Sequence, residues 1–220
     1  MTPTTRGVLF DLDGTLVDSY DAIAASLNHA RAAFGEPPYP VAVVRRMVGH
    51  GLETLIEEAL GAERIEAGVR LFREHYDRVG VEGTRTLPGV APTLEALSQR
   101  GYRMGVASNK PARFGRPILE RLGLASHFGA ILGPDLVTHP KPHREMVDRL
   151  LAMLDLKAAD VVYVGDMGID AETCRNAGIR CWLIATGSCS PEELASAGGD
   201  RCLDRFEDLL TLLPAVAGGA

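Results

Sequence analysis

The sequence predicts an α/β fold, a doubly wound parallel sheet that carries an inserted α-helical cap. From residue 101 onward, short apolar runs alternate with segments of helical periodicity. This order is typical of parallel βαβ units, whose helices cover both faces of one sheet. Residues 18 to 80 instead show helical periodicity and no convincing strand, although a first strand precedes them. The helical stretch therefore interrupts the α/β core.

The strands of the core are predicted from short, buried-looking apolar runs. The first is Val8–Phe10, a β-favouring run without Gly or Pro. Four more strands are predicted at residues 103–107, 130–132, 161–164 and 181–185. Helices are predicted at residues 113–122, 144–154, 171–177 and 192–197, and a last one at 205–213.

The inserted segment is recognised by its spacing of apolar residues. Ile23, Leu27 and Ala30 recur at helical intervals, and Pro37-Pro38 separates the first helix from the next. We expect two short crossings between cap and core, as a hinged lid requires. The predicted division is a core of residues 1–18 and 84–220 and a cap of residues 19–83.

Composition excludes several classes of partner. The chain has 220 residues, 46% of them hydrophobic, and a net charge of −6 without a basic tract, so no nucleic-acid partner is expected. No stretch approaches the roughly 20 apolar residues of a membrane span, so no membrane partner is expected, and the cytoplasm is the expected location. The four cysteines show no zinc-ligand spacing and are expected to be free thiols.

Two carboxylates, Asp11 and Asp13, directly follow the first strand, and Gly14-Thr15 ends the extended backbone after them. Burying two acids beside an apolar strand is unfavourable unless a cation or strong hydrogen bonds compensate. The carboxyl ends of strands are also where ligands bind in open α/β sheets. A strand that ends in a solvated acidic turn is the alternative.

Polar residues also follow two later strands. Ser108 and Asn109 place a hydroxyl and an amide just before a helix, where they suit a phosphate oxygen; an ordinary turn and helix cap is the alternative. Lys141 lies between two prolines, which restrict the backbone and so aim its side chain. The alternative interpretation is that Lys141 is a solvated surface charge.

The strand at residues 161–164 runs into Gly165-Asp166, and Asp170 follows four residues later. A further carboxylate thus arrives at the same edge of the sheet. The complete order is two acids, a hydroxyl and amide pair, a lysine, and then one or two acids.

This order and spacing resembles the four-motif signature of the haloacid dehalogenase superfamily, over essentially the whole chain. The segments Gly49-His50-Gly51, 107–111 and 187–194 look most like the phosphoglycolate phosphatase group. The resemblance implies a Rossmann-like core with an inserted cap. One departure is Met167, where many relatives carry Ser or Thr; it removes a hydroxyl but no charge.

The resemblance implies an enzyme that uses Mg²⁺ and a phosphoaspartyl intermediate. Asp11 would attack phosphorus, and Asp13 would protonate the leaving oxygen and then deprotonate water. The Asp11 carboxylate, the Asp13 carbonyl and Asp166 would bind the Mg²⁺, which favours oxygen ligands.

The same resemblance assigns the remaining motif residues to the phosphate. Ser108, Asn109 and Lys141 would stabilise the phosphoryl oxygens as charge spreads in the transition state. Asp170 would not contact the phosphate itself but would orient Lys141.

Hydrolysis of a small, phosphoglycolate-like phosphate monoester is the function the sequence favours. A sugar-phosphate mutase of the same superfamily remains open, because transfer to a second substrate needs the same aspartate pair, and a pyrophosphatase remains open as well. Dehalogenation is disfavoured by Asp13, and Schiff-base chemistry in the cap by the absence of any lysine before Lys110. A binding module without enzymatic activity is disfavoured, because such a protein would have lost motif aspartates and Asp11, Asp13 and Asp166 are all present. The physiological ester and the oligomeric state, monomer or homodimer, are undetermined.

The loop Gly49-His50-Gly51 is expected to reach the active site from the cap. Glycines permit close approach to a ligand, and His50 would donate a hydrogen bond to substrate. Arg45 and Arg46 are further candidates for meeting a substrate carboxylate. The alternative is a helix that ends at Gly49 and an exposed His50.

Overall fold

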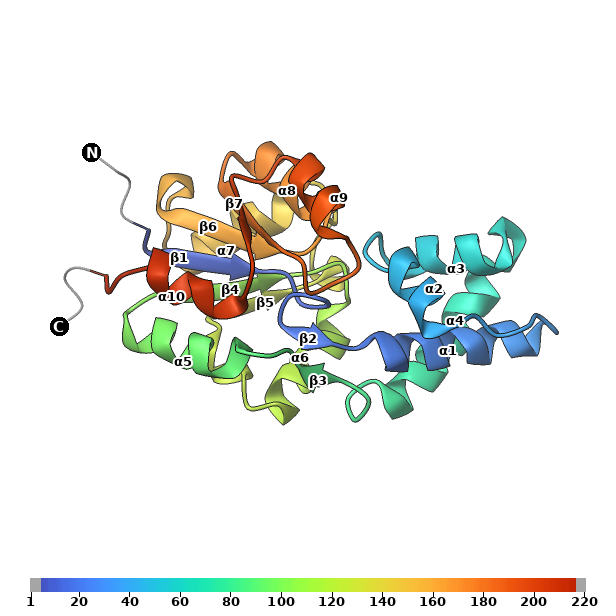
Figure 1. Ribbon diagram of the computed structural model, residues 1–220. Coiled ribbons are helices and arrows are strands. Elements are labelled where there is room, and N and C mark those ends of the chain that lie inside the picture. The colour runs from blue at the N-terminus through green and yellow to red at the C-terminus, as the bar shows by residue number, and fades with distance from the viewer. Residues whose placement is uncertain (1–4, 217–220) are drawn as a thin grey trace.

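The protein is described by a computed structural model over residues 5–216. Its main body is a six-stranded sheet in the order β5-β4-β1-β6-β7-β8, and all neighbouring strands are parallel (Figure 1). The strands are β1 (Gly7–Phe10), β4 (Arg103–Ala107), β5 (Ala130–Leu132), β6 (Val161–Gly165), β7 (Arg180–Ile184) and β8 (Arg201–Leu203). From β1 the chain builds outward in both directions, which confirms the predicted doubly wound sheet.

Helices cover both faces of this sheet because successive strand residues point to opposite sides. Val8 and Phe10 pack with α5, α6 and α10, whereas Leu9 packs with α7, α8 and α9. These helices are α5 (Val90–Gln99), α6 (Ala112–Arg121), α7 (Glu145–Met153), α8 (Gly168–Ala177), α9 (Pro191–Ala197) and α10 (Leu209–Leu212). Short 3₁₀ turns occur at η1 (Ala62–Arg64), η2 (Ala125–His127), η3 (Pro134–Leu136), η4 (Ala158–Asp160) and η5 (Phe206–Asp208). Because helices cover both faces of the sheet, the central strand β1 is buried along its whole length.

The inserted helices form a second body beyond one end of the sheet (Figure 1). They are α1 (Tyr20–Ala33), α2 (Val41–Met47), α3 (Leu52–Leu60) and α4 (Ile65–Val79). They share an apolar core, which includes Leu27, Ile56 and Phe72 and to which α6 of the main body contributes Phe114. The two crossings pair as a short antiparallel ladder of β2 (Val17–Asp18) and β3 (Arg85–Thr86). The boundaries of the cap at residues 19 and 83, and its mobility, stay predictions.

The structure differs from the predicted elements at the edges of the core. Helix α5 and strand β8 are not among the predicted elements. Strand β8 exposes two of its three residues, so it lacks the apolar run by which a buried strand is recognised. The single helix predicted over 205–213 is divided into η5 and α10, and the strand predicted at 181–185 lies one residue earlier.

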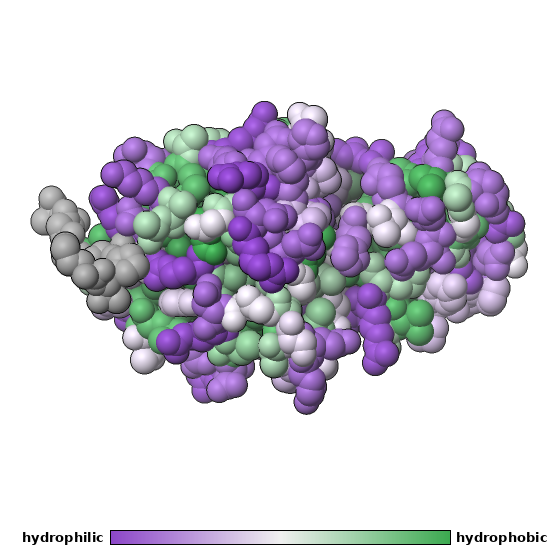
Figure 2. Space-filling view, turned by 90° about the horizontal axis from the view of Figure 1, so that it is seen from above, coloured by the Kyte–Doolittle hydropathy of each residue, from purple (hydrophilic) through white to green (hydrophobic). Residues whose placement is uncertain are grey.

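The face seen from above is mostly hydrophilic, with apolar residues scattered among the polar ones (Figure 2). Val41, Val43, Leu136 and Met153 are the large apolar side chains exposed among the described residues. Within residues 5–216, none of the helices combines the length and the apolar character needed to cross a membrane.

Candidate active site

The predicted catalytic aspartates lie at the carboxyl end of β1, which points toward the inserted helices (Figure 1). Strand β1 is central, with β4 and β6 as its neighbours, so the ends of three strands meet here. Asp11 and Asp13 are only 6% and 9% exposed. Such burial argues against a solvated acidic turn and requires compensating partners.

Lys141 is the first of these partners. Its ammonium nitrogen lies 3.0 Å from Asp11 Oδ1 and 2.7 Å from Asp170 Oδ1, and it donates to the Tyr163 hydroxyl at 3.1 Å. Burial alone lowers the pKa of Lys141, but the charges of the two aspartates outweigh it and hold that pKa above its usual value. Lys141 is therefore a buried cation beside Asp11, not a surface charge.

Asp170 holds Lys141 in place and also fixes the loop after β6. Its Oδ1 accepts from Lys141, while its Oδ2 accepts the backbone N–H groups of Asp166 and Met167 at 3.1 and 3.0 Å. Both carboxylate oxygens are thus occupied by donors of the protein. This arrangement suits the predicted orienting role of Asp170.

Asp166 is completely buried at the end of β6. Its Oδ1 accepts from the Thr15 hydroxyl at 2.9 Å, and its Oδ2 accepts from Ser188 N–H at 3.3 Å. Burial raises the pKa of Asp166 well above its usual value, and the charges of Asp11 and Asp170 raise it further. A Cβ at Gly187 would lie 1.6 Å from Asp166 Oδ2, so only glycine fits against this carboxylate.

Two of the three buried aspartates, Asp11 and Asp166, suit a hard divalent cation, whereas both carboxylate oxygens of Asp170 are already bonded within the protein. Oxygens of Asp11, Asp166 and Asp170 lie within 4.8 Å of one another, with Lys141 as the cation paired with them. Burial is the largest cause of the raised pKa values of Asp11 and Asp166; the charge of Asp170 raises both further, and the charge of Lys141 lowers both. All-oxygen donors are the ligands that Mg²⁺ prefers.

Asp13 is held by two groups that the motif analysis did not assign to it. The Ser19 hydroxyl donates to Asp13 Oδ1, and Lys110 Nζ lies 2.8 Å from Asp13 Oδ2. The Lys110 side chain is 7% exposed. Burial lowers the pKa of Lys110, but the charge of Asp13 outweighs this and keeps that pKa above its usual value.

Ser108 and Asn109 follow β4, as predicted, but their side chains serve different purposes. The Asn109 amide accepts from Lys141 N–H at 3.0 Å and donates to the carbonyls of Lys141 and Gly49 at 3.2 and 3.1 Å. The Ser108 hydroxyl oxygen accepts from Lys110 N–H at 3.3 Å, which leaves its own hydrogen to donate. Asn109 thus ties the lysine loop to the inserted helices, and Ser108 faces the cleft.

A cleft of about 640 Å³, its open mouth included, lies between this edge of the sheet and the inserted helices. The core contributes Asp11, Asp13, Ser108, Asn109, Lys110, Pro111, Phe114 and Met167 to its lining. The insertion contributes Ile23, Val48, Gly49, Gly51, Leu52, Leu55, Phe72 and Tyr76. The floor is therefore polar and the opposite wall is mostly apolar.

The predicted cap loop approaches the cleft through its backbone. Gly49 and Gly51 line the cleft, whereas the side chain of His50 is exposed and lies outside the lining. Arg45 donates to the carbonyls of Thr186 at 2.8 Å and Gly187 at 3.1 Å. Contact between His50 and a substrate therefore requires a movement of the loop, and its binding role stays a prediction.

Arg46 is exposed, so of the two adjacent arginines only Arg45 reaches the core. Arg45 also lies over the ring of Tyr20, with its guanidinium carbon 4.5 Å from the ring centroid. Neither arginine lines the cleft.

A family model described as haloacid dehalogenase-like hydrolase matches residues 8–184, most of the chain. The chain belongs to this family. A phosphoglycolate phosphatase of Yersinia pseudotuberculosis is 36% identical over 212 residues, which cover 93% of this chain and 91% of the relative. Phosphoglycolate phosphatase 1 of Pseudomonas aeruginosa is 34% identical over 219 residues, covering 95% and 80% of the two chains.

The haloacid dehalogenase-like fold is also seen in a crystal structure described as a predicted phosphoglycolate phosphatase from Haemophilus somnus. It superposes with a TM-score of 0.88 at 28% identity, over 94% of this chain and 97% of that one. The resemblance inferred from the motifs is thereby confirmed, as is the enzyme class, a phosphatase of the haloacid dehalogenase type.

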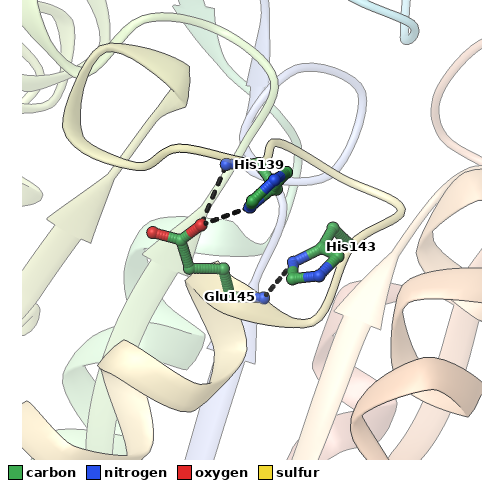
Figure 3. A group of neighbouring side chains, drawn as sticks. All are labelled: His139, His143 and Glu145. Carbon is green, nitrogen blue, oxygen red and sulfur yellow. Dashed lines mark hydrogen bonds and ion pairs between the residues drawn. The ribbon is translucent and has the colours of Figure 1, made fainter.

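Outside the cleft, a second group of possible metal ligands flanks Lys141 in this hydrolase. His139, His143 and Glu145 offer ligand atoms within 4.8 Å of one another (Figure 3). Figure 3 shows the Glu145 carboxylate turned toward His139, whose backbone N–H it accepts at 2.9 Å. His143 Nδ1 in turn accepts the Glu145 backbone N–H at 3.2 Å.

Hydrogen bonding, rather than metal ligation, accounts for this exposed group. The Glu145 carboxylate also accepts from Thr138 N–H at 3.1 Å and pairs with Arg149 at 3.4 Å. The hydrogen bond from Thr138 is the largest of the causes that lower the pKa of Glu145. The carboxylate therefore fixes the loop of residues 138–143, which presents Lys141.

Proposed function

We propose that the protein hydrolyses a small, phosphoglycolate-like phosphate monoester through a phosphoaspartyl intermediate on Asp11, with Mg²⁺ as cofactor. One observation carries the proposal: Asp11 and Asp13 lie buried on the floor of one cleft, each paired with its own lysine. The 36% and 34% identical phosphoglycolate phosphatases support the class of substrate.

In the first step, the Asp11 carboxylate attacks phosphorus and the bond to the leaving oxygen breaks. Burial raises the pKa of Asp11 to about 6, so near neutral pH its carboxylate is mostly ionised and able to attack. Asp13 supplies the proton that the leaving alcohol needs.

In the second step, Asp13 takes a proton from water, and this water attacks the phosphorus of the acyl phosphate. Inorganic phosphate leaves and the Asp11 carboxylate is restored. Per turnover, Asp11 receives the phosphoryl group from the ester and passes it to water, while Asp13 gives one proton to the leaving oxygen and regains one from water. The covalent intermediate splits a difficult hydrolysis into two easier reactions.

In this proposal Lys141 and Ser108 bind the phosphoryl oxygens. Lys141 lies 3.0 Å from the attacking carboxylate, and the Ser108 hydroxyl faces the same cleft. Asp11, Asp166 and the Asp13 carbonyl would hold Mg²⁺, which would neutralise the repulsion between carboxylate and phosphate. Positioning and electrostatic stabilisation account for most of the catalysis in phosphoryl transfer.

The lining of the cleft favours hydrolysis of a small ester over a sugar-phosphate mutase. Among the lining residues from the insertion, Tyr76 is the one with a polar side chain. Sugar hydroxyls would face Leu52, Leu55 and Phe72, and a buried hydroxyl without a hydrogen-bond partner is unfavourable.

The proposal is tested with Asp11→Asn, whose neutral amide cannot attack phosphorus. We expect wild-type enzyme with Mg²⁺ to hydrolyse phosphoglycolate and Asp11→Asn to lose activity by at least about 10³-fold. Rapid acid quenching should trap phosphate on Asp11 of the wild type, located by mass spectrometry. The matched control is Asp18→Asn, an exposed aspartate of the same segment, which should retain activity.

Two results would contradict the proposal. Substantial turnover by pure, folded Asp11→Asn would exclude the covalent mechanism. Hydrolysis of pyrophosphate or sugar phosphates in strong preference to phosphoglycolate would overturn the substrate class while leaving the mechanism in place.

A further inference from the structure

The apolar wall of the cleft contains one unpaired polar group. Tyr76, on α4, is 3% exposed, and its hydroxyl makes no hydrogen bond to any described residue. The ring is fixed by stacking on Phe72 at 5.4 Å and by an edge contact with Phe114 at 5.2 Å between centroids. A buried hydroxyl without a hydrogen-bond partner is unfavourable, so a ligand that bonds to this hydroxyl would be stabilised.

Lys110 lies against the Tyr76 ring at the same cleft. Its ammonium nitrogen lies 4.9 Å from the centroid of the Tyr76 ring. Of its three N–H groups, the described residues account for one hydrogen bond, to Asp13 Oδ2 at 2.8 Å. The remaining donors and the Tyr76 hydroxyl lie at one cleft, and no other lining residue from the insertion has a polar side chain.

The two buried lysines pair with different aspartates of the proposed mechanism. Lys141 pairs with Asp11, the residue that attacks phosphorus, whereas Lys110 pairs with Asp13, the residue that protonates the leaving oxygen. An anionic group bound by Lys110 would therefore lie close to the ester oxygen. Lys141 also shows that one ammonium in this site can hold two carboxylates, since it contacts both Asp11 and Asp170.

We propose that Lys110 and Tyr76 form a binding site for a carboxylate on the leaving group of the substrate. A carboxylate fits because it accepts several hydrogen bonds and neutralises the cation, and an apolar surrounding strengthens both interactions. The substrates are then phosphate esters of 2-hydroxy acids, in which the carboxylate follows the ester carbon directly. This inference rests on the proposed phosphatase function, and it adds the residues that select the leaving group.

Equilibrium binding tests the site without requiring turnover. The probes are 3-phosphonopropionate, in which a methylene replaces the ester oxygen of phosphoglycolate, and propylphosphonate, which has a methyl group in place of the carboxylate. Titration calorimetry with Mg²⁺ should show that the wild type binds the carboxylate probe at least about tenfold more tightly, as expected for a charged hydrogen bond.

Substitutions at Lys110 and Tyr76 measure the contribution of each side chain to this preference separately. Lys110→Met removes the charge, and the preference for the carboxylate probe should fall to within about threefold of unity. Lys110→Arg keeps the charge and should retain more of the preference than Lys110→Met. Tyr76→Phe keeps the ring contacts and removes only the hydroxyl, so it should fold and lose about threefold to tenfold of the preference.

Equal affinity of the wild type for both probes would overturn the proposal. So would a folded Lys110→Met that keeps the full preference, because Lys110 would then serve only to hold Asp13. If Lys110→Met does not fold, an undiminished preference in Tyr76→Phe would overturn the proposed site. Failure of the proposed function is a separate result, absence of phosphoglycolate hydrolysis by wild-type enzyme, and it leaves the binding comparison valid.

Discussion

Asp13 is the residue whose surroundings differ most from what its motif alone suggests. Ser19 and Lys110 both donate to its carboxylate, from positions 6 and 97 residues away in the sequence. These two donors fix the orientation of the carboxylate at the cleft. A fixed orientation is what a group needs to pass a proton to a leaving oxygen and then accept one from water.

Asp13→Asn should therefore affect substrates according to their leaving groups. On an alkyl phosphate such as phosphoglycolate, we expect kcat/KM to fall about 10² to 10⁴-fold, because the alkoxide needs a proton. On p-nitrophenyl phosphate, whose leaving group needs little protonation, formation of the phosphoenzyme should survive and be visible as a burst of nitrophenol. Normal turnover of the alkyl ester, or no burst with the aryl ester, would contradict the acid and base role.

Helix α2 and the loop that follows connect the insertion to the core. Arg45 donates from this helix to two backbone carbonyls of the segment after β7, and Gly49 accepts from Asn109. These contacts join the wall of the cleft to its floor. Such polar contacts can break and form again as an element opens and closes over a substrate, and they add to the apolar packing of Phe114 against Tyr76.

Arg45→Gln should weaken this closure, and the adjacent Arg46→Gln provides a matched control because Arg46 is exposed. Loss of two hydrogen bonds from a charged donor is expected to lower kcat/KM for phosphoglycolate about tenfold or more. Arg46→Gln should stay within about twofold of the wild type. Hydrogen exchange at residues 186–188 should rise only in Arg45→Gln. Equal behaviour of the two variants would show that Arg45 does not hold the cleft closed.

At the scale of the whole molecule, the buried carboxylates make folding stability dependent on pH. Burial raises the pKa of Asp11 from 3.8 to about 6, and burial likewise raises that of Asp166. Between about pH 4 and pH 6 the folded chain thus binds more protons than the unfolded chain. The contribution of Asp11 to the free energy of unfolding therefore falls as pH rises through this window, and the raised pKa of Asp166 acts in the same direction.

Mg²⁺ should reverse this loss because it binds the ionised carboxylates. In wild type, we expect 5 mM Mg²⁺ to raise Tm above its value in EDTA by several degrees at pH 7.5 and by less at pH 5. Asp166→Asn should be more stable than wild type in EDTA at pH 7.5 and should respond little to Mg²⁺. Asp155→Asn, at an exposed aspartate, is the control and should behave as the wild type does. A Mg²⁺ response that is the same in Asp166→Asn and wild type would contradict the metal site.

The sequence was sufficient to predict the α/β core and the residues that meet at one edge of its sheet. Apolar periodicity is a local property, so it located β1, β4, β5 and β6 and identified the polar residues that follow them. In a parallel sheet the carboxyl ends of strands converge, which is why Asp11, Ser108 and Asp166 could be placed together before their geometry was known. Elements without a clear periodic signal, such as β8, were missed for the same reason.

Only the tertiary structure decided how the inserted helices complete the cleft. Lys110 pairs with Asp13, and Arg45 contacts the segment after β7, although these residues are far apart in the chain. The hydroxyl of Tyr76 is left unpaired at the same cleft. No local pattern encodes such contacts, because they depend on how two separately packed bodies meet. The sequence by itself therefore determined which polar residues meet at the edge of the sheet, and the packing of the insertion against the core determined the apolar wall that faces them.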